Sequence, residues 1–342
     1  MKLGLQLGYW FAQPPVGVAE QVKAAEELGF DSVWTAEAWG SDCFTPLAWW
    51  AKDTTRIRWG TSICQLSART PTATAMTAIT LDHLTEGRFT LGLGVSGPQV
   101  VEGWYGQPFP KPLARTREYV EVIRRVLKRD EPLVFHGEFY DHPLQGGLGL
   151  GKPLKSIVHP RRADLPIFLG AEGPKNVALT AEIADGWLPI FYSPALDDEY
   201  RGYLGEGFAR PTARRSLDDF EVVTTVNVVP GDDVETCADF VRPFLAFYIG
   251  GMGAKNMNFH FDVFCRMGYE AEATKIQELF LDGHRDEAVA AVPTALVEDV
   301  ALVGPPEKIR DDLARWEETV VTTMLVAGPP EQLRRTAEIV LG

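Results

Sequence analysis

Six residues of this chain satisfy the spacing of a dinucleotide-binding loop. Gly92, Gly94 and Gly97 stand in the order G-x-G-x-x-G, and in that motif the glycines let the backbone approach a pyrophosphate where a helix begins. Here the first two glycines lie inside an apolar, β-rich run over 89–95, and a proline follows the third. The next helix is predicted only from about Leu113. We therefore interpret the glycines as strand residues that admit close packing, with a ligand-facing loop after the strand.

A second glycine-opened turn precedes an expected helix at 175–183. Free backbone N–H groups and the positive end of the helix dipole make such a turn suitable for an anion. The residues expected to hold an anionic group there are Gly170, Ala171, Glu172, Gly173, Pro174, Lys175 and Asn176.

Other chemistries are disfavoured by what the sequence lacks. It contains no G-x-S-x-G motif and no P-loop, which argues against serine hydrolysis and against nucleotide triphosphate hydrolysis. The four cysteines are scattered, and the six histidines show no metal-ligand spacing, so no metal site is expected. A net charge of -14 argues against nucleic acid and anionic membranes as partners. With no signal peptide or apolar span evident, a reducing cytoplasm is expected.

Apolar patterning divides the chain into alternating strands and helices. Strands are expected at 2–8, 31–36, 58–64, 89–95, 166–170, 186–191, 220–229 and 320–326. Helices are expected at 16–28, 45–54, 72–84, 113–128, 175–183, 234–247, 269–281, 294–301, 306–316 and 331–340. Sustained alternation implies a parallel sheet, and eight units suggest an α/β fold of the (β/α)8 TIM-barrel type with insertions in the loops at the carboxyl ends of its strands. An open, doubly wound sheet is the alternative.

The domain organisation follows from this rhythm. We expect one barrel domain over 1–342, with an irregular insertion around 130–165 and a helical insertion around 234–316. The first insertion is rich in proline and glycine and has room for a short hairpin near 134–140. In a compact domain, long irregular segments of this kind are usually functional loops or covers.

The chain resembles the luciferase-like monooxygenase superfamily, and in particular its deazaflavin (coenzyme F420)-dependent oxidoreductases. The matching segments keep their order along most of the chain and are Asp31-Ser32-Val33-Trp34, Gly60-Thr61-Ser62-Ile63, Arg69-Thr70-Pro71, Thr80-Leu81-Asp82-His83-Leu84-Thr85-Glu86-Gly87-Arg88, Leu91-Gly92-Leu93-Gly94-Val95-Ser96-Gly97, Leu169-Gly170-Ala171-Glu172-Gly173-Pro174 and Ala184-Asp185-Gly186-Trp187.

The resemblance implies a cofactor, a reaction and site residues. Coenzyme F420, or alternatively FMN, would bind at the barrel mouth and exchange a hydride with a small organic substrate, and the protein would form a homodimer. Ser62-Ile63 matches the place of a non-proline cis peptide that supports the ring. Trp39 would wall the ring, and the turn formed by Val95, Ser96 and Gly97 would contact the ring or the cofactor side chain.

The proton donor is less clear from the resemblance. Relatives often carry an acid followed by histidine after the second strand, whereas this chain has Glu37 followed by Ala38. Glu37 and Glu102 are the two acids expected to carry catalysis, with Glu37 on the more rigid strand end. Two alternatives stay open: an FMN-dependent monooxygenase of the same superfamily, and a non-catalytic flavin-binding barrel.

Basic residues gather unevenly in this acidic chain. One group lies between 151 and 176, and a second lies between 201 and 215; together they comprise Lys152, Lys155, Arg161, Arg162, Lys175, Arg201, Arg210, Arg214 and Arg215. Any one of them reads most simply as a solvated loop charge. As a group, the segment 152–175 is expected to receive the anionic tail of the cofactor. The aromatic residues Tyr9, Trp10 and Phe11 end the first strand and are expected to line the substrate cavity.

Overall fold

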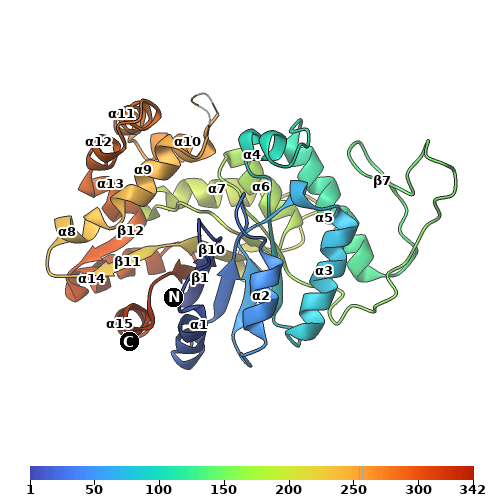
Figure 1. The fold of residues 1–342 in the computed structure, drawn as a ribbon, viewed down its shortest axis with the longest axis horizontal. Coiled ribbons are helices and arrows are strands. Elements are labelled where there is room, and N and C mark those ends of the chain that lie inside the picture. The colour runs from blue at the N-terminus through green and yellow to red at the C-terminus, as the bar shows by residue number, and fades with distance from the viewer. Residues whose placement is uncertain (254, 256) are drawn as a thin grey trace.

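A closed barrel of parallel strands forms the centre of the computed structural model, which describes residues 1–253, 255 and 257–342 (Figure 1). Its eight strands are β1 (Lys2–Gly8), β2 (Ser32–Thr35), β3 (Arg58–Thr61), β5 (Phe89–Gly94), β8 (Ile167–Leu169), β9 (Gly186–Trp187), β10 (Glu221–Thr225) and β13 (Thr323–Val326). Neighbouring strands pair in parallel around the ring, and the β3–β5 pairing closes it. The predicted TIM barrel is confirmed, and the open sheet is excluded.

The interior of the barrel is filled by a few large side chains set against glycines. Trp34, Phe168, Leu188, Val223 and Leu325 form one buried cluster inside the ring. A Cβ added at Gly60 would lie 2.4 Å from the ring of Trp34, and one at Gly186 would lie 2.7 Å from the ring of Phe168. Alternating large and small residues lets the strands close over a filled core rather than a pore.

Gly92 shows why the dinucleotide interpretation fails. It lies inside β5, and a Cβ there would stand 1.7 Å from the carbonyl oxygen of Thr61 on β3. The Thr61 hydroxyl accepts a hydrogen bond from the Gly92 N–H at 2.9 Å. The glycine is therefore required by the close approach of two barrel strands, as the sequence predicts.

Helices cover the outside of the barrel. They are α1 (Val18–Glu27), α2 (Phe44–Ala51), α3 (Pro71–Leu84), α5 (Pro112–Lys128), α6 (Pro174–Ile183), α7 (Asp197–Phe208), α14 (Pro306–Glu317) and α15 (Pro330–Val340), with short 3-10 turns η1 (Leu66–Ala68), η2 (Pro194–Leu196) and η3 (Leu217–Asp219). Their apolar faces bury the main hydrophobic core against the strands. Helix α3 shows how such a helix begins: Thr70 accepts a hydrogen bond from Ala73 N, and Pro71 occupies the first turn.

A second hydrophobic core lies beside the barrel. It is built on the two-stranded parallel sheet of β11 (Asn227–Pro230) and β12 (Ala301–Gly304), with the helices α8 (Val234–Asp239), α9 (Arg242–Gly250), α10 (Phe259–Arg266), α11 (Glu270–Leu281), α12 (Arg285–Ala290) and α13 (Thr294–Val300). The single strand predicted over 220–229 is thus divided at Val226, and its second half leaves the barrel. The single helix predicted over 234–247 is divided as well, because a proline in the first turn of α9 starts a new helix.

The segment 130–165 extends away from the barrel as an irregular excursion, seen at the right of Figure 1. It carries one antiparallel hairpin of β6 (Phe135–His136) and β7 (Asp141–His142), close to the position expected from the sequence. Several of its apolar side chains, such as Leu148 and Ile157, are exposed.

Over the whole described chain, no helix has both the length and the apolar character needed to cross a membrane.

Candidate active site

Three strands supply an apolar floor at the carboxyl end of the barrel. Ile63, after β3, lies against two glycines: a Cβ at Gly94 on β5 would stand 2.7 Å from its Cδ1, and one at Gly170 after β8 would stand 3.2 Å from its Cγ2. The Ser62–Ile63 peptide bond is cis, as the resemblance implies. Ser62 N donates to Thr35 O at 2.6 Å, which ties this floor to β2. Residues predicted from separate motifs are thereby brought together.

The turn after β5 begins another part of the mouth. Ser96 has a left-handed backbone with φ of 58°, and Gly97 leads into a short helix, α4 (Pro98–Gly103). The prediction that no helix begins between Gly97 and Leu113 is therefore wrong. The reason is local: Pro98 at the first turn fixes a helical φ directly after the extended Gly97.

Glu37 is buried at the end of β2 and is held by an ion pair. Arg69 Nη1 and the backbone N–H of Gln65 both donate to its Oε1, at 2.7 and 2.8 Å, and Cys43 N donates to its Oε2 at 3.3 Å. The carboxylate thus ties the ends of two strands together. Its atoms and the thiols of Cys43 and Cys64 lie within 4.8 Å of one another. The guanidinium of Arg69 already supplies the positive charge that a metal ion would bring there.

The other residues expected near the ring lie at the rim. Trp39 is 47% exposed, and Glu102 is exposed on α4. Tyr105, which sequence reasoning missed, links this rim to β2, because its hydroxyl donates to Ala38 O at 3.0 Å. Burial and the nearby charge of Glu37 raise the pKa of Tyr105 to about 12, so it remains a neutral donor.

The turn after β8 presents the amino end of α6 to the mouth. Gly173 precedes the helix with extended φ and ψ of -91° and 151°, and within the described residues no side chain caps the helix. A Cβ on Gly173 would meet no atom within 4 Å, so open space lies before the helix end. Lys175 is exposed in its first turn. These features suit the anionic group for which the turn was predicted.

Glu172, in the same turn, has an unusual environment for an acid. Its Oε1 accepts a hydrogen bond from Ile190 N, after β9, at 2.9 Å. Burial raises its pKa to about 8, although that N–H and the charge of Arg266 act in the opposite direction. Sequence reasoning placed it only among the cofactor contacts. Its position at a strand end, like that of Glu37, was a clue that the sequence offered.

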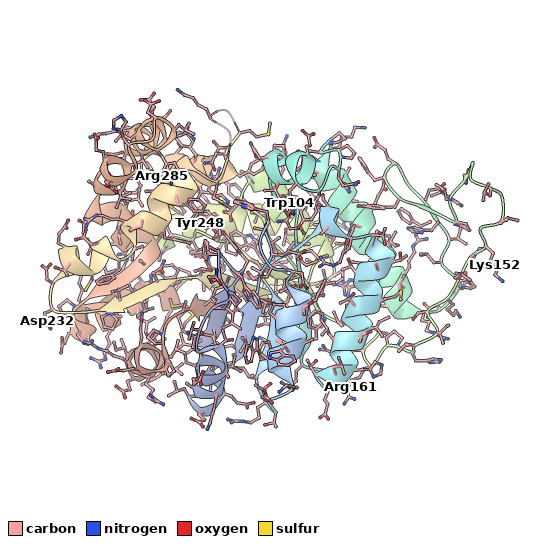
Figure 2. All side chains as sticks on the ribbon, viewed as in Figure 1. Trp104, Lys152, Arg161, Asp232, Tyr248 and Arg285 are labelled. Carbon is pink, nitrogen blue, oxygen red and sulfur yellow. The ribbon has the colours of Figure 1, made fainter. Side chains whose placement is uncertain are left out.

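Several of the basic residues that the sequence singled out lie away from the mouth. Arg162 Nε donates to Asp82 at 3.1 Å, and Arg215 Nε donates to Asp185 at 2.9 Å, both near the amino ends of the strands. Figure 2 labels Arg161 on the side opposite Trp104 and Tyr248, with Lys152 out on the excursion. Within the segment 152–175, which was expected to receive the cofactor tail, Arg162 is therefore committed to an acid at the other end of the barrel. Arg215, from the second basic group, is committed in the same way. Arg162 and Arg215 neutralise Asp82 and Asp185, two acids that are buried there.

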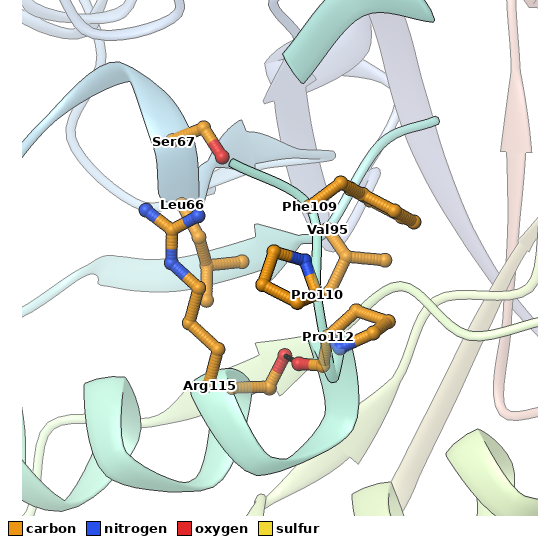
Figure 3. A pocket seen from close by; sticks show the side chains of 8 residues that line it. Leu66, Ser67, Val95, Phe109, Pro110, Pro112 and Arg115 are labelled. Carbon is orange, nitrogen blue, oxygen red and sulfur yellow. Dashed lines mark hydrogen bonds between the residues drawn. The ribbon is translucent and has the colours of Figure 1, made fainter. Parts of the chain in front are cut away.

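Two hollows adjoin the mouth. The smaller, drawn in Figure 3, has a volume of about 10 Å³, which is room for about one water molecule. It lies against Val95 and is lined by Leu66, Ser67, Val95, Phe109, Pro110, Pro112, Arg115 and Thr116. The larger is an open groove of about 680 Å³, lined by Trp10 and Phe11 beyond β1 and by Trp49 and Trp50 on α2. Of the three aromatic residues predicted to line a cavity, Trp10 and Phe11 line this groove and Tyr9 does not.

The comparisons with known proteins agree with this geometry. The model of the family described as luciferase-like monooxygenase matches residues 8–323. A protein of Mycobacterium tuberculosis is 60% identical over 343 residues, covering 99% of both chains; its name assigns it provisionally to the coenzyme F420-dependent oxidoreductases.

Solved structures share the fold. The coenzyme F420-dependent tetrahydromethanopterin reductase of Methanopyrus kandleri superposes with a TM-score of 0.81 at 22% identity, covering 99% of this chain and 98% of that one. A type II Baeyer-Villiger monooxygenase component of Pseudomonas putida, in complex with FMN, superposes with a TM-score of 0.66 at 18% identity, covering 99% and 96%.

Proposed function

Because this chain belongs to the luciferase-like monooxygenase family, we propose that it is a coenzyme F420-dependent oxidoreductase that transfers a hydride between the deazaflavin and a small organic substrate. The observation that carries this proposal is the pairing of two surfaces at one barrel mouth. Ile63 lies over Gly94 and Gly170 as an apolar floor, and the uncapped amino end of α6 opens beside it. A flat ring with an anionic tail needs both surfaces.

The residues present have distinct parts in this proposal. When bound, the cofactor supplies the hydride exchange itself. Ile63 and the two glycines support the ring, and the turn over 95–97 approaches its edge. Gly173, Lys175 and Asn176 hold the anionic group at the helix end. Glu37, fixed by Arg69, ties the end of β2 to the short strand β4 (Cys64–Gln65). The catalytic role predicted for Glu37 and Glu102 remains a prediction.

FMN is the second candidate cofactor. It is favoured by one observation, namely that an FMN-bound monooxygenase component shares the fold over nearly the whole chain. Coenzyme F420 is preferred because the relative at 60% identity carries that cofactor in its name. We also propose that the protein is a homodimer and that it works in the cytoplasm, where its four free cysteines would stay reduced.

Direct binding tests the assignment. The purified protein is titrated with coenzyme F420, FMN and NADPH, and cofactor fluorescence is followed. We expect coenzyme F420 to bind at least tenfold more tightly than FMN, a difference of about 1.4 kcal/mol. If coenzyme F420 binds no more tightly than FMN, FMN becomes the proposed cofactor. If neither binds, the proposed function is wrong.

A charge variant tests the position of the tail. Lys175→Gln at the start of α6 should weaken coenzyme F420 binding about three- to fivefold, or roughly 0.6–1 kcal/mol, at low salt. The loss should shrink in high salt because exposed charges are screened. Lys152→Gln, out on the excursion, is the matched control and should bind as the wild type does. Equal losses in the two variants would contradict this placement.

A further inference from the structure

Glu172 differs from the other acids near the mouth in its electrostatic environment. Glu37 is paired with Arg69, and Glu102 is exposed. Glu172 is half-buried, and its carboxyl group accepts one backbone hydrogen bond, from Ile190. Within the described part of the chain, no cation forms a salt bridge with this carboxyl group. An acid that is withdrawn from water without a paired charge favours its neutral form.

Arg266, on α10, holds the backbone at this acid rather than its side chain. Its Nη2 donates to the carbonyl oxygen of Glu172 at 2.7 Å. Its Nε is buried and, among the residues described, has no partner. The guanidinium therefore positions the turn after β8 and leaves the carboxyl group free to exchange a proton.

Other buried polar atoms on the helices near this turn also lack partners. Within the described residues, these are Arg266 Nε, the Tyr200 hydroxyl on α7, which is close enough to Glu172 for the charge of that acid to raise its pKa, and His260 Nδ1 on α10. The His260 ring lies 5.0 Å, between centroids, from the ring of Tyr248 on α9. Buried polar groups in proteins are nearly always hydrogen-bonded. The unsatisfied atoms of Arg266 and Tyr200, both beside Glu172, indicate a place for the polar part of a ligand.

The titration behaviour agrees with this arrangement. Burial raises the pKa of Glu172 to about 8, against the effects of Ile190 and Arg266. Burial also raises the pKa of Tyr200 and of Tyr248, and it lowers the pKa of His260 to about 4. At pH 7 the two phenols and the imidazole are therefore neutral. Glu172 is mostly protonated and has a proton to give.

We propose that Glu172 is the proton donor of a reductase, acting on a substrate with a polarised double bond held between the turn after β8 and helices α7, α9 and α10. As the hydride adds to one atom of that bond, the O–H bond of Glu172 breaks and its proton goes to the other atom. The substrate gains two electrons and two hydrogens in all: a reduced deazaflavin bound at the mouth would supply the hydride, and Glu172 would recover its proton from solvent. This inference rests on the proposed function.

Infrared spectroscopy of the ligand-free protein tests the protonation of this acid. At pH 6 the difference between the wild type and Glu172→Gln should contain the C=O band of a neutral carboxyl group. In the wild type that band should fade with a midpoint near pH 8. Glu37→Gln, which removes the acid paired with Arg69, is the matched control and should leave the neutral-acid band of Glu172 in place. If Glu172→Gln removes only ionised-carboxylate bands at pH 6, the proposal is overturned.

Adding oxidised coenzyme F420 tests whether the acid faces the site. The neutral-acid band of the wild type should shift when the cofactor binds, and Glu172→Gln should bind the cofactor within about threefold of the wild type. An unmoved band, or a loss of affinity above tenfold, would overturn the donor role and leave coenzyme F420 binding by the wild type intact. Failure of the wild type to bind coenzyme F420 would overturn both the proposed function and this inference.

Discussion

Glu37 and Glu172 are both acids at the ends of barrel strands, yet their surroundings suit opposite tasks. Arg69 and two backbone N–H groups surround Glu37, which favours a fixed carboxylate. Among the described residues, one N–H, that of Ile190, donates to the carboxyl group of Glu172, which favours a group that can change its protonation state. A difference in environment of this kind is how one protein can give two carboxyl groups different roles.

Glu37→Gln should lower the free energy of unfolding by about 1–3 kcal/mol, because it leaves the half-buried Arg69 without its counter-ion. Coenzyme F420 affinity should change less than about threefold. Urea denaturation and a fluorescence titration measure the two quantities. Glu102→Gln, on the exposed side of α4, is the control and should alter neither. Unchanged stability in Glu37→Gln would show that the ion pair has little structural role.

At this scale, the sequence predicted where site residues lie better than what they do. Ile63 and the turn over 95–97 were recognised through the family resemblance, and the turn over 170–176 was recognised because its glycines precede a helix. What these residues do depends on partners distant in the chain. Arg69 pairs with the carboxylate of Glu37, whereas Arg266 hydrogen-bonds the backbone of Glu172 and not its carboxyl group. Pairings of this kind follow from the folded topology and cannot be read from local pattern.

The helix that begins after Gly173 gives a prediction at the scale of elements. Gly173→Val should fold normally, because the backbone there is extended and the space around it is open. The added side chain would occupy the region before α6, so coenzyme F420 binding should weaken about tenfold or more, which is ~1.4 kcal/mol. Gly202→Ala, at an equally open position on α7, is the control. Normal binding by Gly173→Val would place the anionic tail elsewhere.

Strand packing gives another prediction at this scale. Gly92→Ala should destabilise the protein by about 3 kcal/mol, because its methyl group would overlap the Thr61 carbonyl oxygen on β3. Gly103→Ala, where no atom lies within 4 Å, should change stability by less than about 0.5 kcal/mol. Thermal or urea unfolding measures both variants. Similar values for the two would mean that the barrel relaxes around the new methyl group.

All eight barrel strands could be predicted because each is an apolar run between turn residues. The helices α4, α7, α10 and α12 were missed. Of these, α4 and α12 have only six residues each, and α7 contains three glycines, which favour a loop assignment. The division of the strand at Val226 was also missed, since both halves are rich in valine and only their partners differ.

The whole molecule should lose stability in acid through Glu182 on α6. Arg117, Thr212 and Arg210 donate to its carboxylate and lower its pKa to about 2. Because the folded pKa lies below the ordinary value of 4.5, this contribution is present above about pH 4.5. It should be lost as the pH falls towards 2.

Glu182→Gln should therefore be less stable than the wild type near neutral pH, and the gap should narrow between pH 5 and pH 2. Urea denaturation across that pH range measures the gap. Glu206→Gln, at an exposed position on α7, should follow the wild-type curve. A constant gap at all pH values would show that the loss comes from packing rather than from ionisation.

The second hydrophobic core has an evolutionary consequence. The side of the mouth that contains Ile63, Gly94 and Gly170 belongs to the barrel, whereas Tyr248, His260 and Arg266 belong to helices α9 and α10 beside the separate core. Substitutions that repack these helices need not disturb the closed ring of strands. If the proposed sites hold, evolution could therefore change the substrate through helices α9 and α10 while the barrel residues that would support the cofactor stay the same.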